Sequence, residues 1–176
     1  MPLLMPLEEN GVRVHFPDSN YFQLSTCSAY QAISGQGVKE MDIGCLDTTN
    51  NILWLVEMKG YYHPSNARHL PKDLSKATEV DNILDELCTK SIHTLCQITT
   101  TRAGTKSCIG QVIPDQTSIK LVYLIRTIPG QETYLNPMQD ALRAKLKSFI
   151  AIYRIDAVTI IDYDYAVSQQ LLSWVV

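Results

Sequence analysis

The chain has 176 residues and a formal net charge of −3, with 45% hydrophobic and 19% charged residues. This length predicts a single domain over residues 1–176, because two domains of ordinary size would not fit. The apolar content excludes a long disordered tail, and the negative charge excludes a protein that coats nucleic acid through bulk positive charge. The overall charge does not exclude a local basic groove.

The start of the chain and its cysteines indicate a compartment. The first residues lack the basic start of an export signal and reach Glu8 and Glu9 before an apolar stretch could form. No apolar run approaches the roughly 18 to 20 residues of a membrane helix. The five cysteines are odd in number and form no Cys-x-x-Cys pair, which favours reduced thiols. We therefore expect a cytoplasmic protein with no membrane partner.

The first third of the chain predicts a strand, a helix and a hairpin. Residues 11–16 alternate in polarity and are typical of a short strand, and residues 21–34 are predicted to form a helix that Gly35 ends. Residues 39–47 and 52–60 are apolar-rich runs separated by turn residues. They predict a β-hairpin with a four-residue loop.

The remainder predicts helices that alternate with strands. Apolar residues recur at helical spacing over 74–96, as one long helix or as two joined near Thr89. Residues 119–126 and 157–162 are near-continuous apolar runs, typical of strands that are covered on both faces. These elements predict an α/β fold with a single mixed β-sheet flanked by helices.

A further helix is predicted between the last two strands. Asn136 can cap its start, Pro137 suits its first position, and Gln139 stands where a capping box needs it. Apolar residues at helical spacing continue to Tyr153.

The hairpin loop sets the register of its two strands. With Asp47 paired to Ile52, the register places Asp42 opposite Glu57. Glu40 and Lys59 then follow on the same face. The opposite face carries an apolar stripe that we expect to form the core, made of Met41, Ile43, Cys45, Trp54, Val56 and Met58.

Two carboxylates that face each other across a hairpin repel, so we expect a cation between Asp42 and Glu57. Mg²⁺, or Mn²⁺ in its place, prefers carboxylate oxygens and keeps waters for a substrate phosphate. Lys59 lies one pleat beyond Glu57 and could stabilise developing negative charge or help to deprotonate an attacking water. This pattern points to hydrolysis of a phosphodiester bond.

The segments Met41-Asp42-Ile43 and Val56-Glu57-Met58-Lys59 resemble the motif of the PD-(D/E)xK nuclease superfamily. The resemblance implies a restriction-endonuclease-like αβββαβ core and a Mg²⁺-dependent nuclease acting on DNA, with RNA as the other polymer. It implies that Asp42, Glu57 and Lys59 are catalytic, and that Asp42, Glu57 and the Met58 carbonyl bind the metal. Many members work as dimers, so the apolar end at residues 171–176 is a candidate homodimer interface.

The stretch after Lys59 mixes basic and aromatic side chains. Such a loop could hold phosphates and stack on unpaired bases, and an ordinary polar loop is the other interpretation. The candidate nucleic-acid-binding residues are Tyr61, Tyr62, His63, Arg68, His69, Lys72 and Lys76.

Two other interpretations of the charged hairpin stay open. One is a structural ion-pair cluster on a solvent-facing surface, in which Lys59 pairs with Glu40 or Glu57. The other is a noncatalytic nuclease-fold module that binds nucleic acid or a protein partner. The predicted first helix carries no Asp or Glu to hold a second metal ion, and Asp47 is assigned to the turn. Motifs for zinc hydrolases, for serine or cysteine nucleophiles and for nucleotide binding are absent from the sequence.

Overall fold

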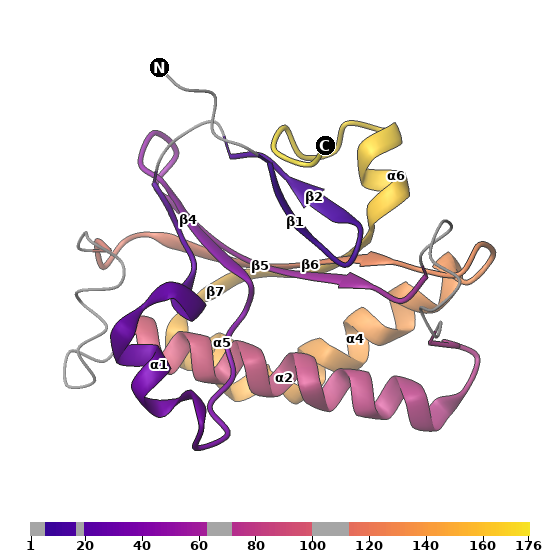
Figure 1. Ribbon diagram of the computed structural model, residues 1–176, viewed down its shortest axis with the longest axis horizontal. Coiled ribbons are helices and arrows are strands. Elements are labelled where there is room, and N and C mark those ends of the chain that lie inside the picture. Colours follow the sequence, from indigo (N-terminus) through magenta and orange to yellow (C-terminus); the bar gives the residue numbers. More distant parts are fainter. Residues whose placement is uncertain (1–5, 17–19, 63–71, 100–112) are drawn as a thin grey trace.

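The computed structural model describes residues 6–16, 20–62, 72–99 and 113–176 (Figure 1). Two short 3-10 helices, η1 (Leu24–Thr26) and η2 (Glu132–Tyr134), precede α1 and α4. The other elements in chain order are β1 (Leu7–Glu9), β2 (Val12–Val14), β3 (Tyr21–Phe22), α1 (Ser28–Ser34), β4 (Ile43–Asp47), β5 (Ile52–Gly60), α2 (Ala77–Thr99), β6 (Ser118–Arg126), α4 (Leu135–Lys145), α5 (Lys147–Tyr153), β7 (Ile155–Asp162) and α6 (Tyr163–Ser168).

The main sheet has five strands in the order β3-β4-β5-β6-β7. The pairs among β3, β4 and β5 are antiparallel, whereas β5, β6 and β7 are parallel, so the predicted mixed sheet of an α/β fold is confirmed. The prediction of a single sheet is wrong, because β1 and β2 form a second, two-stranded sheet. Figure 1 shows α2, α4 and α5 on one face of the main sheet, and β1, β2 and α6 on the other.

The main sheet is buried on both faces by two separate cores. The core under the helices includes Leu53 and Leu55 of β5, and the core under β1, β2 and α6 includes Ile43 and Val56. The predicted stripe therefore forms the second core, with one exception. Met41 lies in the first core, because β4 begins only at Ile43 and the alternation of side chains does not extend back to Met41.

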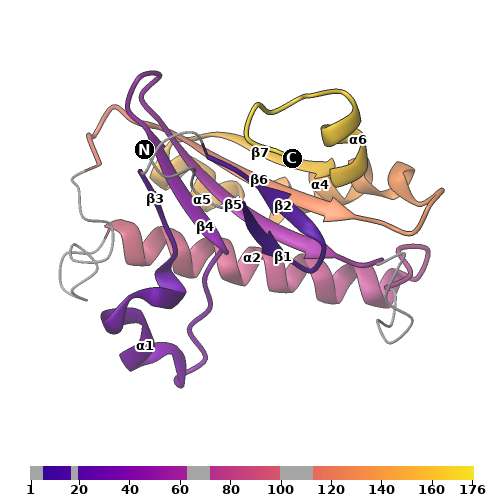
Figure 2. The ribbon, with the colours of Figure 1, turned by 45° about the horizontal axis from the view of Figure 1, so that its top comes forward.

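The small sheet is a hairpin that turns at Asn10 and Gly11, whose φ angles are 52° and 77°. Positive φ at both central residues is the geometry of a two-residue hairpin turn, and Asn-Gly is its strongest signal, which our strand prediction did not use. Figure 2 shows this hairpin lying over β5. A Cβ atom on Gly60 would lie 2.0 Å from the Asn10 carbonyl oxygen, so only glycine lets the turn cross the end of β5.

The C-terminal segment packs against its own chain. The Trp174 ring stacks on Phe16 with centroids 4.9 Å apart, and the Trp174 carbonyl accepts the His15 N–H at 2.7 Å. Leu171 and Val176 stay 48% and 43% exposed. The homodimer interface at residues 171–176 remains a prediction, and only these two side chains offer it substantial apolar surface.

The helix predicted over residues 21–34 is only partly correct. Tyr21 and Phe22 instead pair with β4 as strand β3, and the α-helix is confined to Ser28–Ser34. Aromatic side chains favour strands, and packing against the sheet decides the outcome here. A Cβ atom on Gly44 would lie 2.1 Å from the Phe22 ring, which shows how closely that ring covers β4.

The helix predicted between the last two strands exists, but its start differs from the prediction. Helix α4 begins at Leu135, so Asn136 lies inside the helix and does not cap it. Gln139 does not form a capping box, because its Oε1 accepts the N–H of Ile160 at 2.8 Å and ties α4 to β7. The helix is interrupted at Leu146, after which α5 continues to Tyr153.

The register of the β4–β5 hairpin is confirmed, with Asp47 paired to Ile52 and Ile43 paired to Val56. The turn assignment of Asp47 is also confirmed. Its Oδ1 accepts the N–H groups of Thr49 at 3.0 Å and Asn50 at 2.9 Å, and its Oδ2 accepts from Asn50 Nδ2 at 2.7 Å.

Replacing Asp47 with alanine is expected to lower the free energy of unfolding by about 1 kcal/mol, because the turn N–H groups lose their acceptor. The loss is measured by urea denaturation. Asp47→Asn keeps one side-chain oxygen, so its free energy of unfolding is expected to lie between those of the wild type and Asp47→Ala. Equal unfolding midpoints for the wild type and Asp47→Ala would show that the turn forms without this carboxylate.

Cys27 is disulfide-bonded, so the prediction of reduced cysteines is wrong at this position. Cysteine count and spacing do not say which thiols the fold brings together. Within the ranges described above, none of the helices is both long and apolar enough to cross a bilayer.

Candidate active site

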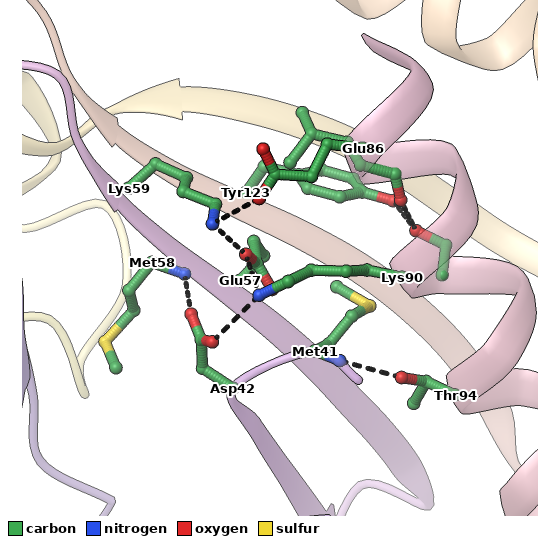
Figure 3. A network of polar contacts seen from close by, with 11 residues as sticks. Met41, Asp42, Glu57, Met58, Lys59, Glu86, Lys90, Thr94 and Tyr123 are labelled. Atoms are coloured by element: carbon green, nitrogen blue, oxygen red, sulfur yellow. Dashed lines mark hydrogen bonds and ion pairs between the residues drawn. The ribbon is translucent and has the colours of Figure 1, made fainter. Parts of the chain in front are cut away.

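Asp42 stands directly before β4, and its carboxylate continues the β4–β5 ladder beyond the last backbone pair. That pair joins Ile43 to Val56, and the next available N–H on β5 belongs to Met58. Asp42 Oδ2 accepts this N–H at 2.6 Å (Figure 3). The predicted approach of Asp42 to Glu57 therefore comes about through a side chain that takes the place of a backbone acceptor.

Glu57 lies in the middle of β5 on the face that α2 covers, and its side chain is completely buried. Its Oε1 lies 2.6 Å from Lys90 Nζ and 2.9 Å from Lys59 Nζ. Its Oε2 has no hydrogen-bond partner among the described residues. The interpretation of the charged hairpin as a solvent-facing ion-pair cluster is therefore wrong, because Glu57 is buried. Lys59 does pair with Glu57, as that interpretation expected.

Lys59 and Lys90 link the carboxylates into one chain of contacts. Lys59 Nζ reaches Glu86 Oε1 at 2.8 Å, and Lys90 Nζ reaches Asp42 Oδ1 at 3.3 Å. Figure 3 shows the order Asp42, Lys90, Glu57, Lys59, Glu86 between β5 and α2. The structure thus brings the three predicted residues together and adds two that sequence reasoning missed.

The two added residues come from α2, the helix that follows the hairpin. Glu86 and Lys90 are four residues apart and therefore lie on the same face of that helix. This i, i+4 pair of opposite charge beside the apolar stripe was the signal that could have found them. The helical spacing of apolar residues alone could not show that the side of α2 with Glu86 and Lys90 meets the charged face of the hairpin.

Burial and charge act against each other on Glu57. Burial raises its pKa, the nearby Asp42 carboxylate raises it further, and the ammonium groups of Lys59 and Lys90 lower it. The net result is a pKa of about 7, up from 4.5. Glu57 therefore changes charge near neutral pH, whereas an ordinary glutamate is fully ionised there.

Lys59 is held in its charged form. Burial lowers its pKa, but the Glu57 charge and the hydrogen bonds to Glu86 and Glu57 outweigh burial, so that the net shift is upward. For Glu86, burial raises the pKa, while the hydrogen bond from Lys59 and the nearby ammonium groups produce a net decrease. Lys59 is thus an ammonium ion at every pH at which the protein would work.

Two further carboxylates lie at the margin of this cluster. Burial raises the pKa of Glu9, at the end of β1, and the Asp42 charge raises it further. The pKa of Glu40 is also raised by burial, and the nearby Lys90 ammonium offsets only part of this increase. The predicted pairing of Lys59 with Glu40 does not occur, because Lys59 points to Glu57 and Glu86 instead. Glu9 was missed because its approach depends on the β1–β2 hairpin.

The candidate nucleic-acid-binding residues are only partly within the described chain. His63, Arg68 and His69 lie outside the described residues. Tyr61 is 4% exposed in the first core, so its ring offers no face for a base to stack on. Tyr62 is half-buried, and Lys72 is exposed with its ammonium 5.1 Å from the Tyr61 ring centroid. Lys76 pairs with Glu79 at 3.5 Å.

Asp42 and Glu57 offer carboxylate oxygens of the kind that a small divalent cation binds. One ammonium, that of Lys90, already lies within reach of both carboxylates, and the buried Glu57 Oε2 has an unused lone pair. Carboxylate oxygens are the ligands that Mg²⁺ and Mn²⁺ prefer. Among the described side chains, no group of three or more His, Cys, Asp or Glu is arranged to hold a metal, so water and backbone would have to complete the shell.

Comparisons with family models, with curated proteins and with solved structures found no match to this chain. Its function is therefore inferred from the residues of this cluster.

Proposed function

We propose that the protein is a Mg²⁺- or Mn²⁺-dependent nuclease that hydrolyses phosphodiester bonds in DNA, with RNA as the other polymer. The observation that carries the proposal is the meeting of Asp42, Glu57 and Lys59 in one network in which Glu57 is fully buried and one of its oxygens has no partner among the described residues. A buried carboxylate with an unused oxygen destabilises a fold, so stability alone gives no reason to keep it. Binding a cation would give that oxygen a partner.

Asp42 and Glu57 would hold the metal ion, with the Met58 carbonyl as a further ligand. When bound, the ion would polarise the phosphate and lower the pKa of an attacking water. The hydrogen bond from the Met58 N–H to Asp42 Oδ2 orients the Asp42 carboxylate and leaves its Oδ1 facing the cluster. Both ligands are thereby held by β4 and β5 before any substrate arrives.

Lys59 would stabilise negative charge that develops on the phosphate in the transition state. Its raised pKa supports this role over that of a general base, because a base must first lose its proton. Glu86, hydrogen-bonded to Lys59 Nζ, would hold the ammonium in position.

Membership of the PD-(D/E)xK superfamily remains part of this proposal. The element order around the site, with the β4–β5 hairpin followed by α2 and β6, supports it in outline. The described residues between α1 and α2 form two strands, whereas the αβββαβ order calls for three. The proposal therefore depends on the site more than on the core.

A noncatalytic module that binds nucleic acid or a protein partner is the second candidate. The observation that favours it is the Lys90 ammonium, which lies between Asp42 and Glu57 and neutralises them without a metal. If Lys90 stays there, the carboxylates need no divalent ion.

The two candidates are separated by incubating the purified protein with single- and double-stranded DNA, and with RNA, in Mg²⁺, in Mn²⁺ or in EDTA. The enzyme is expected to cleave at least one polymer only with metal present. Calorimetry with Mn²⁺ should show binding to the wild type and to Asp85→Asn, a surface control on α2, and none to Asp42→Asn. A wild-type protein that neither cleaves nor binds metal would favour the noncatalytic module.

A further inference from the structure

Lys90 has no role in the proposed nuclease reaction, yet it contacts both proposed metal ligands. Its Nζ lies 2.6 Å from Glu57 Oε1 and 3.3 Å from Asp42 Oδ1 (Figure 3). A cation that bound Glu57 Oε1 together with Asp42 Oδ1 would occupy the place of this ammonium. The ammonium and a divalent ion cannot both be there, because like charges at contact distance repel strongly.

The charges of the cluster favour an exchange of one cation for the other. Three carboxylates, Asp42, Glu57 and Glu86, meet two ammonium groups when all are ionised, which leaves an excess of one negative charge. A divalent ion in place of the Lys90 ammonium would bring this sum to zero. Among these five side chains alone, adding the ion without releasing Lys90 would leave an excess of one positive charge, with Glu9 and Glu40 at the margin of the cluster.

Lys90 makes one short contact, to Glu57 at 2.6 Å, and one long contact, to Asp42 at 3.3 Å. The distance to Asp42 is at the long end for an ion pair, and Glu57 Oε2 is left without a partner by this arrangement. The Lys90 side chain is 15% exposed, so its flexible stem has a route to solvent. Release breaks the 2.6 Å contact with Glu57, and the incoming ion would have to offset that loss.

The backbone of α2 around Lys90 is fixed, so only the side chain would move. The neighbouring Ser91 Oγ lies 2.5 Å from the Tyr123 hydroxyl on β6, and the Thr94 hydroxyl accepts the Met41 N–H at 2.8 Å. These bonds join α2 to β6 and to the segment directly before β4. Release of Lys90 therefore needs a change of rotamer and no movement of the helix.

We propose that Lys90 is a displaceable counter-ion that holds Asp42 and Glu57 together in the metal-free protein and competes with the divalent cation for them. This inference rests on the proposed function, because it needs a metal at these carboxylates. It makes Lys90 a determinant of metal affinity. Occupation of the site is then set by the exchange of an internal ammonium for an external ion.

The test is calorimetric titration of Mn²⁺ and Mg²⁺ into the wild type, Lys90→Met, Lys90→Arg and Lys145→Met at about pH 8.5, where carboxylates are ionised. Methionine keeps an unbranched apolar stem without the charge, and we expect it to bind metal at least about tenfold more tightly than the wild type. Lys90→Arg keeps the charge and is expected to bind no more tightly than the wild type. Lys145→Met removes an ammonium of α4 that pairs with Asp85, and it should leave the metal affinity unchanged.

Thermal melting gives a second readout that does not depend on cleavage. Without metal, Lys90→Met should melt below the wild type, because two buried carboxylates have lost a counter-ion. Saturating Mn²⁺ should raise its melting temperature by more than that of the wild type. Lys90→Gln replaces the methionine variant in both measurements if that variant does not fold.

The outcomes separate this inference from the proposed function. If the wild type binds metal and Lys90→Met binds it equally or more weakly, Lys90 is not a competitor and the inference is overturned, while the metal site stands. If neither protein binds metal, the site itself is rejected and the inference with it. Tighter binding by Lys90→Arg would also overturn it, because the charge would then have no effect.

Discussion

Replacing Lys59 with methionine is expected to slow metal-dependent cleavage by a factor of about 10² to 10³, the usual effect of removing one group that stabilises transition-state charge. The Lys59 ammonium is fixed by Glu57 at 2.9 Å and Glu86 at 2.8 Å and stays protonated, so it needs no rearrangement as negative charge develops. The rate is measured on a labelled oligonucleotide at saturating Mg²⁺, once the preferred polymer is known.

The control for this experiment is Lys145→Met, which removes a lysine that pairs with Asp85 on the outer side of α2. It should cleave at the wild-type rate. Circular dichroism and thermal melting must show that both variants fold, since Lys59 also neutralises a buried carboxylate. Equal cleavage by the wild type and folded Lys59→Met would reject the catalytic assignment and would point to a contaminating nuclease.

Replacing Glu57 with glutamine is expected to stabilise the metal-free protein at about pH 8 by up to about 3 kcal/mol, and to leave it nearly unchanged at about pH 4. The pKa of Glu57 is about 7 in the folded protein and 4.5 in the unfolded chain. Between these values the folded state holds one more proton than the unfolded state. The wild type therefore loses stability as the pH rises from about 4.5 to about 7, and the glutamine variant does not.

Urea denaturation in EDTA across this pH range measures the difference between the two proteins. Glu86→Gln is a matched control of opposite sign, because the net shift in the pKa of Glu86 is downward from 4.5. The wild type should gain stability relative to that variant as the pH rises toward about 4.5, and the difference should stay level above it. A wild type more stable than Glu57→Gln at pH 8 would mean that the two ammonium groups outweigh burial.

These predictions follow from an arrangement that the sequence revealed only in part. The hairpin register was predictable because a short loop and the period of two fix which residues face each other. The same period placed Glu57 and Lys59 on one face. It could not show whether that face meets water or a helix, and in the fold α2 covers it and leaves Glu57 completely buried.

The partners of these residues depend on contacts between distant parts of the chain. Lys90 meets Asp42 and Glu57 across 48 and 33 residues. Glu9 approaches Asp42 only because the Asn10–Gly11 turn packs on Gly60. Charged side chains carry no periodic signal that identifies their partner, so these meetings could not be derived from spacing. The burial of Tyr61 was missed because it depends on core residues from other parts of the chain.

The amino-acid sequence by itself determined the α/β class, the register of the β4–β5 hairpin and the strands β6 and β7, because loop length and apolar periodicity are local properties, although β7 is an edge strand and is not covered on both faces as predicted. It also determined that Asp42, directly before β4, approaches Glu57 and Lys59 on the neighbouring strand β5. Only the tertiary structure decided that α2 closes over them and brings in Lys90 and Glu86. Burial and the balance of charge are set by every element that packs around a site, and they decide whether three charged residues form a surface ion pair or a place for a metal ion.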